Sequence, residues 1–293
     1  MKHIIFDCDS TVGLPGKPMD DALALLYLLG RPEEAEILGI TCTFGNGTVP
    51  EVYGSTTRLL QEIGRTDIPL LGGADRGEDP RSAAARFIVD TVNARPGEIS
   101  LVGLGSLTNF YGAYLLDDAF FDKVKEIVLM GGYTGPVIYH GISLDELNFS
   151  QNPAAAACVL SRGRNISILT GNNTLEPSYL PRAEFLERVH PDSFIAKKCG
   201  YRFDDQGNRY GSPISYCWDV VATVYLLHPE LFTDVPTSCA IKEHALTAGW
   251  LAPNQEDCRD NRIINLPVVS DAAAYRREMF SGWQNFQMRE DIQ

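Results

Sequence analysis

Short apolar runs rich in β-branched residues alternate along this chain with longer segments of helical, amphipathic periodicity. Runs with the length and composition of buried strands are Ile4–Phe6, Ile37–Thr43, Pro69–Leu71, Ile99–Val102, Glu126–Met130, Ile166–Thr170, Ser238–Ile241 and Ile263–Val269. Segments with helical spacing of apolar residues are Asp20–Leu29, Val49–Ile63, Ala83–Asn93, Ser106–Leu115, Pro153–Ser161, Pro181–Val189, Tyr216–Leu227 and Ala272–Trp283. Such alternation is typical of parallel sheets whose two faces are covered by helices. The sequence therefore predicts a Rossmann-like α/β fold, with a mostly parallel open sheet and helices on both faces.

The chain shows no internal repeat, low-complexity stretch or Ser/Gly-rich linker, so we expect one domain over residues 1–293. Side-chain oxygens that could cap a first helical turn stand at Asp20, Thr48, Ser82, Ser106, Asn152 and Ser270. Ligands of open α/β sheets bind beyond the carboxyl ends of the strands. The polar residues that directly follow each strand are therefore the candidates for a functional site.

Composition narrows the classes of partner. With 44% hydrophobic residues among 293, the chain can bury a large core, and its formal charge of −13 argues against nucleic acid or an anionic membrane as a partner. No apolar run reaches the roughly 20 residues that a membrane span requires. The seven cysteines are an odd number without C-x-x-C spacing, which indicates reduced thiols of a cytoplasmic protein rather than disulfides or a zinc site. A small neutral or cationic ligand fits this charge better.

Four aspartates stand where the first strand ends and the next helix begins. Asp7 and Asp9 follow the apolar run, and Asp20 and Asp21 open the helix. Taken alone, Asp20 and Asp21 are what a helix N-terminus favours, because first-turn acids interact well with the helix dipole. Four converging carboxylates, however, repel one another more than capping can offset unless a cation lies among them. All-oxygen donors without a histidine or cysteine pattern favour Ca²⁺ or Mg²⁺ over zinc.

The same strand supports a second interpretation. Asp7, Asp9 and Thr11 resemble the D-x-D-x-T motif of the haloacid dehalogenase-type phosphatases, which implies an Mg²⁺-dependent phosphatase with Asp7 as nucleophile and Asp9 as general acid. That family also needs a late acidic pair in a glycine-rich turn after a strand. The late acids of this chain, such as Asp257 and Asp271, do not stand in such a turn. The phosphatase motif is half complete, and this function remains an alternative.

A longer resemblance, to the inosine-uridine preferring nucleoside hydrolase family, runs through the chain in order. The matching positions are Asp9 with Asp20-Asp21, Thr43–Asn46, Leu101–Asn109, Val128–Gly132, Glu146–Asn148 with Asn152–Ala154, and Trp218-Asp219. In that order they resemble the family's D-x-D-x-G-x-D-D opening, its V-x-G-N turn, its L-x-P-x-x-x-L-T-N and V-x-M-G-G segments, its E-x-N followed by D-P-x-A, and the aromatic or histidine before its last metal-binding aspartate. The resemblance covers about residues 3 to 285.

The resemblance implies a bound Ca²⁺ ion. The carboxylates of Asp9, Asp21 and Asp219 would hold it, together with the main-chain carbonyl of Leu104. A backbone ligand tolerates leucine at that position. Water and ribose hydroxyls would complete the roughly six to eight oxygens that Ca²⁺ takes.

The resemblance also implies which residues bind the sugar of a ribonucleoside. Asp20 would accept a hydrogen bond from the 2′-hydroxyl and Asn148 would donate one to it. Glu146 would reach the 5′-hydroxyl. His140 stands where the family has an asparagine on that same hydroxyl, so it is a further candidate for substrate binding.

The implied reaction is hydrolysis of the N-ribosidic bond, which gives free base and ribose through an oxocarbenium-like sugar. Asp9 would accept the proton of the attacking water, near which Asn46 would lie. Trp218, which also stands in this slot in the purine-preferring members, would stack on a purine and favour its departure without a dedicated acid. The resemblance further implies a homodimer or homotetramer. A relative that binds nucleosides without turnover is the other alternative.

The chain departs from the family's pattern close to the expected metal. Residues Ser10–Met19 separate Asp9 from Asp20, whereas the family's opening motif has a much shorter spacer. This insertion either bulges outward and returns, or folds over the pocket and reshapes it. The lid loop after the third strand is short, reduced to Gly72–Arg81, and Leu147 replaces an aromatic that stacks on the ring. These departures leave the preferred nucleoside open.

Overall fold

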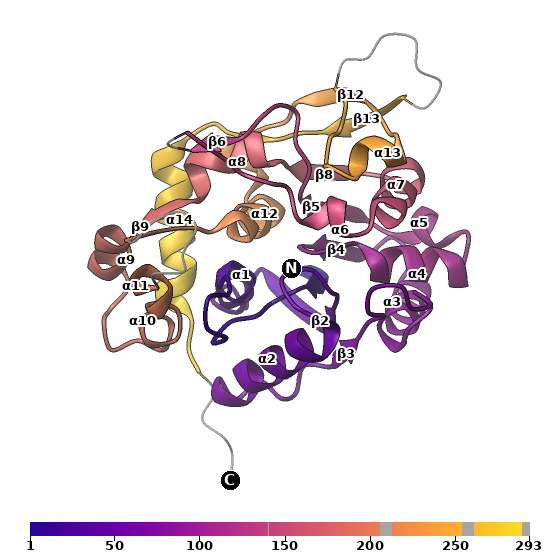
Figure 1. Ribbon diagram of the computed structural model, residues 1–293. Coiled ribbons are helices and arrows are strands. Elements are labelled where there is room, and N and C mark those ends of the chain that lie inside the picture. Colours follow the sequence, from indigo (N-terminus) through magenta and orange to yellow (C-terminus); the bar gives the residue numbers. More distant parts are fainter. Residues whose placement is uncertain (140, 206–212, 254–260, 289–293) are drawn as a thin grey trace.

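A mostly parallel sheet runs through the centre of the computed structural model, which describes residues 1–139, 141–205, 213–253 and 261–288 (Figure 1). Within these residues the strands of the sheet are, in spatial order, β12 (Pro236–Ala240), β13 (Asn261–Asn265), β8 (Ile166–Leu169), β5 (Glu126–Met130), β4 (Ile99–Gly103), β1 (Lys2–Cys8), β2 (Ala35–Cys42) and β3 (Leu70–Gly72). Neighbouring strands pair in parallel, except that β12 and β13 are antiparallel. The predicted fold class is confirmed.

Helices lie on both faces of this sheet (Figure 1). They are α1 (Asp20–Leu29), α2 (Val49–Glu62), α3 (Ala83–Ala94), α4 (Thr108–Leu116), α5 (Phe120–Lys123), α6 (Asn148–Gln151), α7 (Pro153–Arg162), α8 (Gly171–Ser178), α9 (Arg182–Arg188), α10 (Phe194–Cys199), α11 (Tyr201–Asp204), α12 (Trp218–Leu227), the 3₁₀ turn Pro229–Leu231, α13 (Glu243–Leu246) and α14 (Ala272–Asn285). Small ribbons pair β9 (Tyr179–Pro181) with β10 (Ile214–Tyr216), β11 (Phe232–Thr233) with β14 (Val268–Val269), and β6 (Ile138–Tyr139) with β7 (Ile142–Ser143).

The order of the strands creates a switch point at β1. The strands β1, β2 and β3 extend one way along the sheet, whereas β4, β5 and β8 extend the other way. Connections that leave in opposite directions open a crevice at the carboxyl ends of the two central strands, and ligands of open α/β sheets bind there. Because β1 ends at Cys8, Asp9 is the first residue at the edge of this crevice.

Alternate residues of β1 enter two apolar clusters, one on each face of the sheet. Ile4 and Phe6 pack among side chains of α1, α12 and α14, whereas Ile5 packs among those of α3, α4 and α7. A strand that is buried on both faces has no polar face, which explains its continuous apolar run. Each of these side chains contributes roughly 1.5–3 kcal/mol by its burial. The core thus fixes the end of β1 that carries the acids.

Helix starts were only partly predictable. The side-chain caps are confirmed at Thr48, Ser82 and Asn152 and are wrong at Asp20, Ser106 and Ser270. Asp20 is already helical, and the left-handed Leu107 (φ 59°) precedes α4 in place of Ser106. At α14 the cap is Asp271, one residue later than predicted.

Two further differences concern element length. The predicted strand Ile263–Val269 divides into the end of β13 and β14, since Pro267 has no N–H for a ladder. Helices such as α6, α10 and α11 were not predicted because they are too short to show a repeating apolar face. In the described part of the chain, no helix is long and apolar enough to cross a bilayer.

Candidate active site

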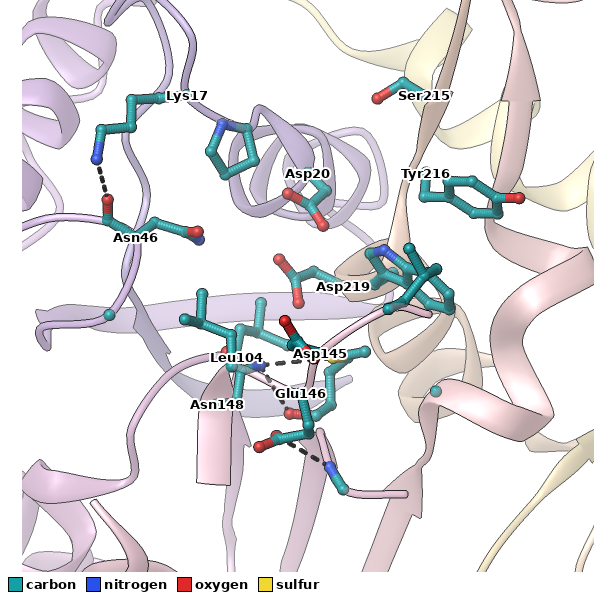
Figure 2. Close-up of a pocket in the computed structure, with 18 of the residues that line it drawn as sticks. Lys17, Asp20, Asn46, Leu104, Asp145, Glu146, Asn148, Ser215, Tyr216 and Asp219 are labelled. Atoms are coloured by element: carbon teal, nitrogen blue, oxygen red, sulfur yellow. Dashed lines mark hydrogen bonds between the residues drawn. The ribbon is translucent and has the colours of Figure 1, made fainter. Parts of the chain in front are cut away.

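A cavity of about 360 Å³ opens at the carboxyl ends of the central strands (Figure 2). Its wall includes Asn46 after β2, Leu104 after β4, Met130 and Gly132 at the end of β5, and Gly171 after β8. The volume falls within the roughly 300–1,000 Å³ that is usual for sites of small molecules. The cavity therefore lies where the switch point of the sheet predicts a ligand.

Three carboxylates meet at the cavity, two of them in its wall and one directly behind it. Asp20 and Asp21 lie in the first turn of α1, and Asp219 lies in the first turn of α12, which packs against α1. One oxygen of each lies within 4.8 Å of an oxygen of the others. The positive ends of two helix dipoles meet at these acids and stabilise negative charge by roughly 0.3–1 kcal/mol each. Residues far apart in the sequence thus form one acidic cluster.

This cluster has the chemistry of a cation site. Burial, and then the neighbouring carboxylates, raise the pKa of Asp21 and of Asp219 well above the usual range. Asp21 Oδ2 is buried and has no hydrogen-bond partner among the described residues. A buried carboxylate oxygen without a partner is costly, and a cation that it could bind would remove that cost. Because the donors are all oxygens, the residues fit a hard ion such as Ca²⁺ or Mg²⁺.

Asp9 adjoins the cluster through its main chain. Its N–H donates to Asp21 Oδ1 at 3.1 Å. Its carboxylate accepts two bonds from Asn46, one from the main-chain N–H to Oδ2 at 2.6 Å and one from Nδ2 to Oδ1 at 2.9 Å. Burial raises the pKa of Asp9 to about 7, and the Asn46 bonds work against this rise. A side chain at Gly45 would overlap Asp9 Oδ2, so glycine is needed for this approach.

Asp7 does not line the cavity. Its side chain is fully buried, and Oδ1 accepts hydrogen bonds from Thr41 Oγ1 at 2.6 Å and Asn109 Nδ2 at 2.7 Å. Burial raises its pKa to about 7. A nucleophile must reach the substrate. The Asp7 carboxylate instead bonds to side chains of β2 and α4 and does not line the cavity. The phosphatase interpretation, in which Asp7 attacks, is therefore wrong.

The opposite wall of the cavity carries Glu146 and Asn148. The Glu146 carboxylate accepts main-chain N–H bonds from Gly132, Phe149 and Ser150 at 2.8–3.1 Å. These bonds fix α6, whose first residue is Asn148. About one of the four lone-pair positions of Glu146 remains for a ligand. The residue is thus both a support of the wall and a candidate contact, and burial raises its pKa.

Hydrogen bonds to Met130 fix the orientation of the Asn148 side-chain amide. Its Nδ2 donates to the Met130 carbonyl at 2.9 Å and contacts Met130 Sδ at 3.4 Å. Within the described residues its Oδ1 has no hydrogen-bond partner. The side chain is 7% exposed and lines the cavity. This orientation offers an acceptor to a hydroxyl, whereas the sequence had suggested a donor.

Aromatic side chains form a further part of the cavity wall. Trp218 and Tyr216 both line the cavity and stack on each other, with ring centroids 5.0 Å apart and planes inclined by 14°. Tyr216 also makes edge-to-face contacts with Tyr139 and Tyr179 at 5.3 and 5.8 Å. Trp218 was predicted here. Tyr216 was not, although its position two residues before the tryptophan is a signal that could have found it.

The insertion between Asp9 and Asp20 folds back over the cavity. Gly16, Lys17 and Pro18 line it, and Asp20 still reaches the acidic cluster. The sequence had left two arrangements of the insertion open, and the structure shows features of both. Asp20 and Asp21 reach the acidic cluster, and the inserted loop forms part of the cavity wall. Lys17 is a cavity residue that motif comparison missed, because the insertion has no counterpart in the motif.

The remaining candidates are placed as follows. Leu104 and Leu147 line the cavity, as does Asp145, which was not predicted and lies beside Glu146 (Figure 2). His140, predicted to bind the 5′-hydroxyl, lies outside the described residues. The structure thus brings the predicted Asp20, Asn46, Leu104, Glu146, Asn148, Trp218 and Asp219 to one cavity, with Asp9 and Asp21 directly behind it.

Comparison with known proteins gives a consistent result. The family model described as inosine-uridine preferring nucleoside hydrolase matches residues 4–276. The chain is 28% identical to the inosine-uridine preferring nucleoside hydrolase of Crithidia fasciculata, over 90% of this chain and 93% of that protein. It is 31% identical to the probable uridine nucleosidase 2 of Arabidopsis thaliana, over 85% and 84%. The solved structure of a purine-preferring ribonucleoside hydrolase from Gardnerella vaginalis has the same fold, with a TM-score of 0.81 at 21% identity over 97% of this chain and 99% of that one.

Proposed function

Because the chain belongs to the inosine-uridine preferring nucleoside hydrolase family, and is thus an N-ribosyl hydrolase, we propose that it cleaves purine ribonucleosides with the help of bound Ca²⁺. The products are the free base and ribose. Relatives named for uridine and for purines both resemble the chain, so the choice of base is inferred from the cavity itself. A phosphatase reaction has no support from the family or from the position of Asp7.

One observation carries the proposal: a buried cluster of carboxylates lines a cavity next to Asp9, which Asn46 holds by two hydrogen bonds. Asp20, Asp21 and Asp219 would hold Ca²⁺, with Asp9 and the Leu104 carbonyl as further candidate ligands. Bound Ca²⁺ supplies a lowered pKa for water and an anchor for sugar hydroxyls. Carboxylate and carbonyl oxygens, which these residues offer, are the ligands that Ca²⁺ prefers in proteins.

Asp9 is the group that we assign as general base. Burial raises its pKa to about 7 in the metal-free protein, and bound Ca²⁺ would lower that pKa and so favour the ionised carboxylate that a general base requires. The two bonds from Asn46 fix both carboxylate oxygens, so the base does not rotate away from the water that it activates. The proton of the attacking water passes to Asp9 while the C1′–N bond breaks.

The ribose fits between the acidic cluster and the opposite wall. Asp20 and the Oδ1 of Asn148 can accept hydrogen bonds from ribose hydroxyls, and Glu146 has an acceptor position left for another. The base would then contact the stacked rings of Tyr216 and Trp218. A purine covers more of such a surface than a pyrimidine, which supports the proposed purine preference.

The test is a comparison of four substrates under metal control. Purified protein is incubated with inosine, guanosine, uridine or cytidine, and released base is quantified by chromatography, with Ca²⁺ and then with a chelator. We expect kcat/KM for inosine and guanosine to exceed that for uridine, and activity to disappear with the chelator and return with Ca²⁺. Uridine turnover well above inosine turnover would refute the purine preference. Binding of all four without any release would show a relative that has lost turnover.

A further inference from the structure

The insertion contributes a cationic side chain to the active-site cavity. Lys17 lines the cavity, and its Nζ donates to the main-chain carbonyl of Asn46 at 2.5 Å. Asn46 is the residue that holds the Asp9 carboxylate. Lys17 and the proposed general base Asp9 therefore contact the same residue, Asn46, whose bond to Lys17 is drawn in Figure 2.

The inserted segment is fixed on two sides. From α2, Ser55 Oγ donates to the Val12 carbonyl at 2.7 Å in a buried contact. From α11, the Tyr201 hydroxyl donates to the Lys17 carbonyl at 3.3 Å, and Arg202 Nη1 donates to the Gly16 carbonyl at 3.2 Å. These bonds hold the main chain on both sides of the lysine. The position of Lys17 is thus part of the fold rather than a chance orientation of a surface loop.

No acid of the described residues forms an ion pair with Lys17, whose charge interacts with Glu51 only at longer range. Among the described residues that line the cavity, the cationic side chains are Lys17 and Arg202, and Arg202 pairs with Asp205 at 2.8 Å. No carboxylate of the described residues lies within 4.0 Å of the Lys17 ammonium. An ammonium group has three N–H donors, and the bond to Asn46 uses one. Two donors therefore remain for a ligand.

The two walls of the cavity have different polarity. Lys17 and Asn46 lie on one side of Asp20 and Asp219, and Glu146 and Asn148 lie on the other side (Figure 2). If the ribose occupies the acceptor-rich side, as the proposed function requires, the base must extend toward the remaining walls. Those walls are the Lys17 side and, across the cavity from it, the side that carries Tyr216, so the base would lie between them (Figure 2).

We propose that Lys17 is a catalytic residue that protonates the departing base. This inference rests on the proposed function and adds the acid that the motifs did not contain. When the C1′–N bond breaks, its electron pair stays on the base, and the base takes a proton from the Lys17 ammonium. Water adds its hydroxyl to C1′ and its other proton goes to Asp9. Exchange with solvent then returns Asp9 to the carboxylate and Lys17 to the ammonium, so the sum is nucleoside plus water giving base plus ribose.

The test compares leaving groups that do and do not need a proton. In Lys17→Met, kcat/KM for inosine should fall by about 100-fold or more, since general acid catalysis contributes roughly 10²–10⁴. For p-nitrophenyl β-D-ribofuranoside it should change less than about threefold, because p-nitrophenolate leaves as a stable anion. Retained cleavage of the second substrate also shows that the variant is folded. Equal losses on both substrates, or no loss on inosine, would overturn the proposal.

Two further variants separate proton donation from support of Asn46. Lys17→Arg keeps the charge and the bond to Asn46 but does not release its proton at neutral pH, so inosine cleavage should stay at least about tenfold below wild type. Full rescue by arginine would show a positioning role instead. Lys198→Met is the matched control, because Lys198 also contacts the insertion, at Gly13, but pairs with Glu62 and does not line the cavity. If the wild-type protein cleaves neither substrate, the proposed function fails and this inference fails with it; if only the Lys17 comparison fails, the proposed function stands.

Discussion

The contact between Asn46 and Asp9 combines a structural and an electrostatic role. The Asn46 side chain and main chain both donate to the carboxylate, and burial raises the pKa of Asp9 to about 7 even though these bonds lower it. In Asn46→Ala the main-chain bond stays and the Nδ2 bond is lost, so the pKa of Asp9 should rise further. Since the base must be ionised, the acidic limb of the kcat/KM profile should move to higher pH. A pH series with inosine checks this. An acidic limb that stays in place or moves to lower pH would contradict the assignment of Asp9.

Replacing one acid of the cluster should show whether Ca²⁺ affinity depends on the cluster itself or on any buried aspartate. Asp219→Asn takes a carboxylate out of the cluster, and we expect Ca²⁺ affinity measured by calorimetry to fall by about 100-fold or more, because neutral amides bind hard cations less well than carboxylates. Asp7→Asn is the matched control, since Asp7 is equally buried and lies outside the cluster. Its Ca²⁺ affinity should stay within about threefold of wild type. Equal losses in both variants would indicate general disruption of the fold.

At the scale of residues, the acids of the cluster were predicted through the resemblance of their motifs to those of the family. Asp21 and Asp219 lie far apart in the chain, yet each begins a helix after a strand or turn at the same edge of the sheet, and the structure brings them together. Lys17 could not be predicted in the same way. It lies in a segment without periodicity, and its position depends on contacts with Ser55 and Tyr201, which are distant in the sequence.

At the scale of elements, the start of α12 carries two functions one residue apart. Asp219 joins the acidic cluster, and Trp218 faces the cavity beside Tyr216. Stacking of a base on an aromatic ring contributes about 1–3 kcal/mol. In Trp218→Ala we therefore expect kcat/KM for inosine to fall by roughly 5–150-fold and that for uridine to fall less. Ca²⁺ affinity should not change, which calorimetry can confirm. A larger loss for uridine would mean that the tryptophan does not contact the base as proposed.

Elements were predictable where the hydrophobic period was long enough to read. The strands of the central sheet and the long helices α1, α2 and α14 follow the sequence pattern within a few residues. The short helix α6 was not predictable, because two of its main-chain N–H groups bond to Glu146, which also accepts from Gly132, and it has no repeating apolar face. That contact depends on where β5 ends and α7 begins, which is tertiary information. The parts of the site that the sequence missed are thus those formed by loops.

At the scale of the whole molecule, the fold gathers negative charge that it does not neutralise with basic side chains. The chain carries a formal charge of −13, and its most buried acids, Asp7, Asp9, Asp21 and Asp219, lie within or beside one crevice. Burial raises the pKa of each of them. Such an arrangement costs stability whenever these groups are ionised without a cation. The stability of the molecule should therefore depend on pH and on the metal together.

This coupling gives the last prediction, for unfolding by urea between pH 5 and pH 8. The folded pKa values of Asp7 and Asp9, about 7, exceed the unfolded value of about 3.9, so the folded state binds more protons and metal-free protein loses stability as pH rises through this window. Ca²⁺ binds the ionised carboxylates, so its stabilising effect should grow with pH. The pKa of His228 is raised to about 9, so its contribution to stability also falls as pH rises, and it does so equally with and without Ca²⁺. Asp219→Asn should be more stable than wild type at pH 8 in a chelator and should gain little from Ca²⁺. A metal-free wild-type protein whose stability rose from pH 5 to pH 8 would show that the buried carboxylates do not have the raised pKa values described above.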